Sequence, residues 1–155
     1  LKSCWDYTEN NSQKSQGKDK PARRRNEVTV KADYDAADIG PENLDVIELH
    51  DASAPSELVY YETLGLCGSG EGGILAQNGG TALGGRIPVN PSGGLLRKGH
   101  PIGATGLAQI AELTWQIRGQ AGDRQGNGAK IAMAENGGGY IGDDAAVMVI
   151  SVLGA

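Results

Sequence analysis

The chain has 155 residues and a formal net charge of -5, with 19 acidic and 14 basic side chains. This length suffices for one domain with a buried core, and the acidic balance provides no basic surface for nucleic acid or an anionic membrane. No apolar run approaches the roughly 20 residues of a membrane-spanning helix. Two cysteines are too few for a disulfide framework, so we expect a reducing, cytoplasmic setting. The start, LKSCWDY, has neither an initiator Met nor a signal-peptide pattern, and we expect a fragment or a processed chain.

Residues 1–27 are polar, and we expect a lead-in or linker before a single domain over residues 28–155. Residues 23–25 are three arginines, and such a run is typical of a solvated tail. Residues 28–39 carry alanines that suit a short helix, although their Val-Thr-Val start favours a strand. The Gly-Pro pair at 40–41 ends that segment.

Residues 44–49 (LDVIEL) predict a short buried strand. A helix follows, because Ser53 suits an N-cap, Pro55 suits the first turn and Glu57 adds negative charge there. Gly65 is expected to end this helix.

The 25 glycines fall in clusters between apolar segments, which favours tight turns over a flexible linker. The stretch GSGEGG at 68–73 partly resembles a dinucleotide-binding loop. It follows a helical pattern and not a strand, so we reject that interpretation. Cys67 precedes it without a neighbouring base and predicts a buried structural thiol. No cluster of residues has the spacing of metal ligands.

Apolar residues spaced three and four apart predict a helix with one buried face, which consists of Leu107, Ile110, Thr114 and Ile117. Two buried strands are expected at 130–134 and 145–153, with ENGGGYIGDD between them as a hairpin loop. The order of strand, helix, glycine-rich loop, helix and two strands indicates a layered α/β domain.

His50 and His100 each stand at the boundary of a predicted element. A neutral imidazole beside a helix N-terminus can take a proton or donate to an oxyanion. The alternative is that each histidine only caps a turn. Glu135 and Asn136 end a predicted strand before three glycines, which suits either a catalytic loop or an ordinary turn with an exposed carboxylate.

Three blocks of the sequence resemble the thiolase superfamily. NPSGGLLRKGHPIGATGLAQIAEL is similar to its GHPxG block. ELHDASAPSELVYYETLGL resembles the block that reads HDCF in sterol-carrier-protein-x type thiolases and NEAF in the common thiolases. AMAENGGGY lies where the common thiolases carry a C-x-G-G-G loop. The order and spacing of the blocks agree, and the resemblance runs from about residue 36 to the end.

The resemblance implies a thiolase-like layered α/β/α fold, of which this chain is the C-terminal half only. An N-terminal thiolase half, on a separate chain or a missing segment, would supply the nucleophilic cysteine and most of the coenzyme A site. Neither cysteine of this chain lies in such a context. A homo-oligomer is also implied.

The resemblance also implies roles for individual residues. His100 matches the histidine that activates the nucleophilic cysteine, and His50 matches the position that orders a water in the oxyanion hole. Ser92, Gly93 and Gly137 are expected to contact the coenzyme A thioester, which is a substrate. No covalently bound cofactor and no metal are expected.

Two departures point away from thiolysis. Glu135 stands where the common thiolases have an acid/base cysteine, and Ala52 replaces the cysteine of HDCF. This pattern resembles a thiolase-like aldolase subgroup, which cleaves β-hydroxyacyl-CoA and works with an OB-fold partner. Glu135 or Tyr140 would then take the hydroxyl proton, unless Tyr140 is a packing aromatic. The alternative is a non-catalytic acyl-CoA or lipid-binding subunit.

Overall fold

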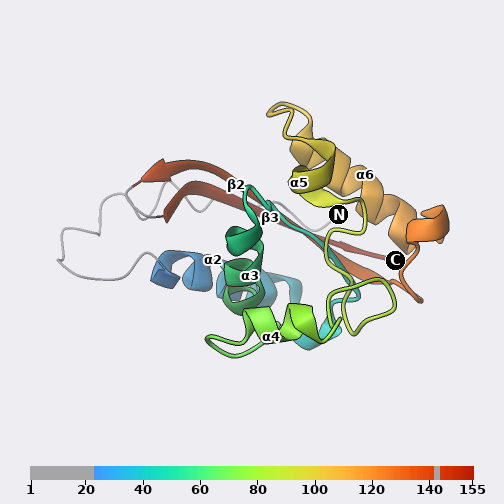
Figure 1. Cartoon of the computed structure of the whole chain (residues 1–155), viewed down its shortest axis with the longest axis horizontal. Coiled ribbons are helices and arrows are strands. Elements are labelled where there is room, and N and C mark those ends of the chain that lie inside the picture. The colour runs from blue at the N-terminus through green and yellow to red at the C-terminus, as the bar shows by residue number, and fades with distance from the viewer. Residues whose placement is uncertain (1–22, 142–143) are drawn as a thin grey trace.

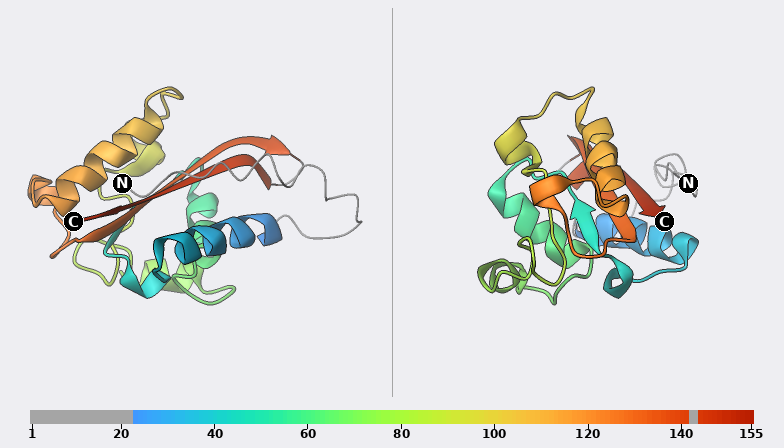
Figure 2. Two further views of the ribbon diagram at one scale, coloured as in Figure 1. Left: turned by 180° about the vertical axis from the view of Figure 1, so that it is seen from behind. Right: turned by 90° about the vertical axis from the view of Figure 1, so that its right-hand side faces the viewer.

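The computed structural model describes residues 23–141 and 144–155. A three-stranded sheet forms its centre, in the order β1 (Val46–Glu48), β2 (Ile131–Ile141) and β3 (Asp144–Gly154). β1 runs parallel to β2, and β3 runs antiparallel to β2. Helices cover both faces of this sheet, so the layered α/β/α fold is confirmed (Figures 1 and 2).

One face of the sheet carries α5 (Gly94–Lys98) and α6 (Thr105–Ile117), while α2 (Arg23–Ala37), α3 (Ala54–Thr63) and α4 (Gly72–Gln77) lie on the other (Figure 1). Short 3-10 helices occupy Pro41–Asn43 and Gly122–Arg124. Within the described ranges, no helix has both the length and the apolar character needed to cross a membrane.

Local signals place α3 as predicted. The Ser53 hydroxyl accepts a hydrogen bond from the backbone N–H of Ser56, and Pro55 lies in the first turn. Gly65 follows the helix with a φ of 74°, a left-handed conformation that glycine adopts without strain. The predicted strand at 44–49 is also confirmed, as the shorter β1.

The helix α2 begins at Arg23, inside the segment 1–27 that was predicted as a lead-in or linker. Residues 1–22 lie outside the described part of the chain. The strand preference of the Val-Thr-Val segment is overridden here, since a helix places Val30 and Tyr34 one turn apart against the core. The Tyr34 hydroxyl donates to the carbonyl of Leu64 and ties α2 to the end of α3.

The predicted buried face of α6 was wrong in part. Leu107 is 73% exposed, and the helix instead buries Leu113 together with polar residues, which are Thr105, Gln109, Glu112 and Gln116. Each polar side chain has a partner: for example, Gln109 Nε2 donates to the carbonyl of Glu135 and Glu112 pairs with Arg124. Satisfied hydrogen bonds make the burial of polar groups tolerable.

The hairpin is present, but its predicted loop was too long. Both strands continue through the glycine run, where Gly137 pairs with Met148 and Gly138 with Val147. The ladder to β3 satisfies the backbone of these glycines, so they form strand despite their low propensity. Only residues 142–143, which lie outside the description, separate the two strands.

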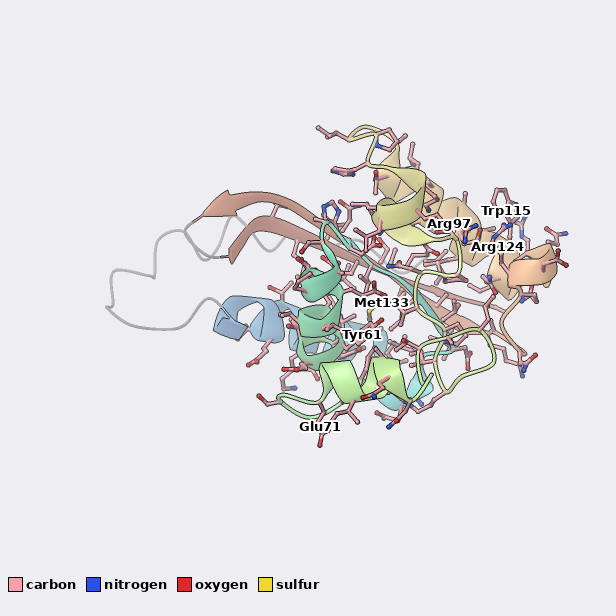
Figure 3. The ribbon with its side chains drawn as sticks, in the orientation of Figure 1. Tyr61, Glu71, Arg97, Trp115, Arg124 and Met133 are labelled. Atoms are coloured by element: carbon pink, nitrogen blue, oxygen red, sulfur yellow. The ribbon has the colours of Figure 1, made fainter. Side chains whose placement is uncertain are left out.

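Two apolar clusters hold the layers together. The side chains of Ile47 and Met133 face α2 and α3, whereas Val46 and Ala132 face Leu113 of α6. This alternation follows from the two-residue period of a strand. Met133, which belongs to β2, has its side chain on the α3 side of the sheet (Figure 3).

Candidate active site

The carboxyl end of β1 is where the candidate residues meet. In the parallel pairing of β1 and β2, Glu48 lies opposite Ala134, so the next residues of both strands reach the same edge. The backbone N–H of His50 donates to Glu135 Oε2 at 2.9 Å. The topology thus joins residues that are 85 positions apart in the sequence.

The two histidines are in direct contact. Their ring centroids are 4.7 Å apart, and the rings meet edge to face at 88°. His100 stands between the end of α5 and the start of α6, after Gly99, whose φ of 80° favours glycine. The geometry therefore supports a shared site over two independent turn caps.

Hydrogen bonds determine which nitrogen of His100 is free. The Thr105 hydroxyl donates its one proton to the carbonyl of Pro101 at 3.2 Å. Its oxygen is then the acceptor for His100 Nδ1, which lies 2.8 Å away. With the Thr105 proton assigned in this way, the neutral imidazole carries its proton on Nδ1, and the lone pair of Nε2 is available to act as a base.

Glu135 is fully buried, and its acidity is strongly altered. Burial raises the pKa of this carboxyl to about 7; the negative charge of Asp51 adds to the rise and the His50 N–H opposes it. At neutral pH the group is populated in both protonation states, as a general acid or base requires. Its Oε1 is buried and has no hydrogen-bond partner among the described residues.

His50 is held in its neutral form. Burial lowers the pKa of this imidazole, the neighbouring His100 lowers it further, and Asp51 opposes both. Its Nδ1 is also buried and has no partner within the described ranges. Glu135 and His50 therefore each have one polar atom without a partner among the described residues. These two atoms are available to form hydrogen bonds with a substrate or a bound water.

Buried polar residues that the sequence interpretation missed hold the loop before His100. Glu48 Oε1 accepts from the Ser92 backbone N–H at 3.0 Å, and Glu48 Oε2 accepts from the Ser92 hydroxyl at 2.6 Å. Lys98 Nζ donates to the same hydroxyl at 2.6 Å. Burial raises the pKa of Glu48, while Ser92 and Lys98 oppose the rise. A carboxylate inside the apolar run LDVIEL was the available signal.

The residues expected to contact the thioester are more dispersed. Ser92 and Gly93 lie in the loop that Glu48 holds, and Gly93 has a φ of 100°. Gly137 is buried in β2, two positions after Glu135. Tyr140 also belongs to β2, but its side chain lies outside the described part of the structure.

Other candidates lie apart from the histidines. Cys67 packs against the core beside α2 and α3, and burial raises the pKa of its thiol, so it is not activated as a nucleophile. Trp115 and Arg124 lie close together near the C-terminal end of α6 (Figure 3). Across residues 23–141 and 144–155, no group of three His, Cys, Asp or Glu side chains could hold a metal ion.

Comparisons with known proteins show the family of this chain. Residues 8–152 match the family described as "Thiolase C-terminal domain-like". The chain is 56% identical over 103 residues to sterol carrier protein 2 of Rattus norvegicus, covering 66% of this chain and 19% of that protein. It is 47% identical over 130 residues to an acetyl-CoA acetyltransferase of Methanothermobacter thermautotrophicus, covering 82% and 34% respectively.

The fold is also shared with a solved structure, "Ltp2-ChsH2(DUF35) aldolase". The TM-score is 0.71 at 22% identity, over 90% of this chain and 34% of the other. The chain thus spans about a fifth of the rat relative and a third of the solved chain. With the match over residues 8–152, the chain belongs to the thiolase C-terminal domain-like family.

Proposed function

We propose that this chain supplies acid–base residues to an enzyme that makes or breaks the C–C bond next to an acyl-CoA thioester. The observation that carries the proposal is Glu135, a fully buried carboxyl with a pKa of about 7 that contacts the His50 backbone. His50 in turn contacts His100. A group poised between two protonation states against the backbone of His50, whose ring meets that of His100, fits proton transfer better than packing.

Retro-aldol cleavage of a β-hydroxyacyl-CoA suits these residues best. Ionised Glu135, or Tyr140 in its place, takes the proton of the β-hydroxyl group. The bond between the α and β carbons then breaks, which releases a carbonyl product and leaves an enolate on the thioester. A ring N–H of His50 donates to the enolate oxygen, and a proton returned to the α carbon through Nε2 of His100 gives the shortened acyl-CoA.

Acyl transfer is the second reaction that the family supports. It needs a cysteine to carry the acyl group, and the free Nε2 of His100 would activate one supplied by an N-terminal half. The exposed Ala52 provides no thiol beside His50. Ala52 and Glu135 occupy the two positions where related thiolases carry an acid/base cysteine. Since neither residue has a thiol, retro-aldol chemistry is favoured.

We further infer that a polypeptide segment outside this chain covers the site. The chain spans 19% to 34% of the relatives reported above, and His100 is exposed beside Ile102, which is 85% exposed. An N-terminal thiolase half is the proposed cover, within a homo-oligomer. An OB-fold protein is the proposed additional partner, in keeping with the aldolase-like substitutions and with the DUF35 component that the solved aldolase carries in its name.

The test uses the complete protein with its N-terminal half. A β-hydroxyacyl-CoA is supplied, and the carbonyl product and shortened acyl-CoA are measured; a parallel assay supplies β-ketoacyl-CoA with free CoA. Glu135→Gln should abolish cleavage, and the exposed Glu42→Gln should leave it unchanged. The proposal fails if the wild-type protein catalyses neither reaction.

A non-catalytic acyl-CoA or lipid-binding subunit is the competing function, and the lipid-carrier name of the rat relative favours it. Turnover separates the two functions. A binding protein has no turnover in wild type and retains its affinity for acyl-CoA in His100→Ala. The enzyme also retains its affinity in that variant but loses turnover by about 100-fold or more.

A further inference from the structure

Asp51, which directly follows His50, is a buried carboxylate that none of the roles above includes. Its side chain is 2% exposed. Oδ1 accepts a hydrogen bond from the Leu95 backbone N–H at 2.6 Å, and Oδ2 accepts from that of Leu96 at 3.3 Å. Both donors belong to the first turn of α5, where backbone N–H groups have no partner within the helix. Asp51 therefore ties the segment after β1 to the start of α5.

Gly94 shows how closely the two segments approach. A Cβ atom at this position would overlap the Asp51 carboxylate. The residue also has a φ of 60°, which other residues adopt only with strain. No side chain other than hydrogen fits between α5 and this carboxylate.

The short length of α5 transmits this contact to His100. The helix consists of five residues and ends at Lys98, two positions before His100. A helix is rigid over so short a span, so fixing its first turn also fixes the direction in which the chain leaves it. His50 is covalently next to Asp51, which means that one carboxylate holds both histidine-bearing segments.

We propose that Asp51 is a positioning residue that holds the His100 ring against His50 through the first turn of α5. The inference rests on the function proposed above, because Asp51 would position the two histidines for the proposed acyl-CoA reaction. Glu48 supports the same loop independently through Ser92, so loss of Asp51 should displace the histidines without unfolding the loop.

The charge of Asp51 adds a readout that a purely structural residue would lack. Titratable groups surround it from three sides: His50 on its own segment, Glu135 on β2, and Glu57 and Tyr61 on α3. Its negative charge raises the pKa of both Glu135 and His50. Neutralising Asp51 should therefore lower both pKa values.

The test compares Asp51→Asn with the exposed Asp123→Asn in the complete protein. Asparagine keeps the size of the side chain and one acceptor oxygen but places an NH₂ group against a backbone N–H. We expect kcat to fall about 100-fold with a much smaller change in KM. The acid limb of the pH–rate profile should move to lower pH. Asp123→Asn should remain within about twofold of wild type and keep its profile.

A second variant covers the case in which Asp51→Asn does not fold. Gly94→Ala pushes the same contact apart from the opposite side and leaves the charge intact. It should lower kcat without moving the pH profile. Comparing Gly94→Ala with Asp51→Asn therefore separates the effect of displacing the histidines from the effect of removing the Asp51 charge.

Histidine NMR spectra make the outcome independent of turnover. In wild type, the His50 and His100 rings should show mutual NOEs and a proton on Nδ1 of His100, and both signatures should be lost in Asp51→Asn. If a folded Asp51→Asn protein keeps these signals, its rate and its pH profile, the inference is overturned. If wild type shows the signals but no activity, the proposed function fails while the positioning role stands.

Discussion

Glu135→Gln is the perturbation whose effect on stability follows most directly from the structure. Burial raises the pKa of this carboxyl from 4.5 to about 7. In the unfolded chain the group ionises near its ordinary value, so between these two pH values the folded state binds more protons than the unfolded state. Stability therefore falls as pH rises from about 4.5 to about 7, and it is lowest above that range.

The size of this effect can be worked out from the two pKa values. At about 1.4 kcal/mol per pH unit, the interval between 4.5 and about 7 corresponds to about 3 kcal/mol. Glutamine is neutral at every pH, and its carbonyl oxygen can still accept the N–H of His50. The variant should therefore gain about 3 kcal/mol over wild type between about pH 4 and pH 8.

Urea unfolding of both proteins at half-unit pH steps measures the difference in the free energy of unfolding. Subtracting wild type from the variant removes the contributions of titrating groups that do not interact with Glu135. Glu42→Gln, at an exposed position, should show no such pH-dependent difference. A difference that stays flat across this pH range would show that Glu135 is not a buried group of raised pKa, and the acid–base role would lose its foundation.

Further outcomes are expected. Because ionised Glu135 acts as the base, the retro-aldol rate of the complete protein should rise about tenfold per pH unit up to about pH 7 and then level off, and Glu135→Gln should show no cleavage at any pH. Thr105→Val removes the acceptor for His100 Nδ1 and should lower kcat by about 100-fold with little change in melting temperature; an unchanged kcat would refute the tautomer assignment. Ile102→Gln should leave the free energy of unfolding within about 0.5 kcal/mol, because this side chain is 85% exposed, yet weaken association with the N-terminal half in sedimentation experiments. Equal association of wild type and variant would contradict the proposed cover.

Interactions within about four residues were predicted well. Ser53, Pro55 and Gly65 placed the ends of α3 because capping and left-handed turns depend on neighbouring backbone groups. The resemblance of the GHPIG and HDA blocks likewise led to the two histidines that the structure brings into contact.

Partners distant in the sequence account for the errors. Leu107 was expected on the buried face of the helix but is exposed, and Gln109 is buried because Glu135 and Asn136 of β2 form hydrogen bonds with it. The glycine run was expected to form a loop, and the pairing with β3 made it a strand. The pattern of residues within α6, or within the glycine run of β2, does not reveal which distant segments supply these hydrogen bonds.

The sequence by itself determined which chemical groups are present, where the local turns and caps lie, and to which family the chain belongs. The tertiary structure alone decided how those groups behave. Exclusion of water around Glu135 raises its pKa, and contacts from Thr105 and Asp51 orient His100 and its segment. These properties depend on desolvation and on contacts across the sheet, which arise only when segments far apart in the chain are packed together.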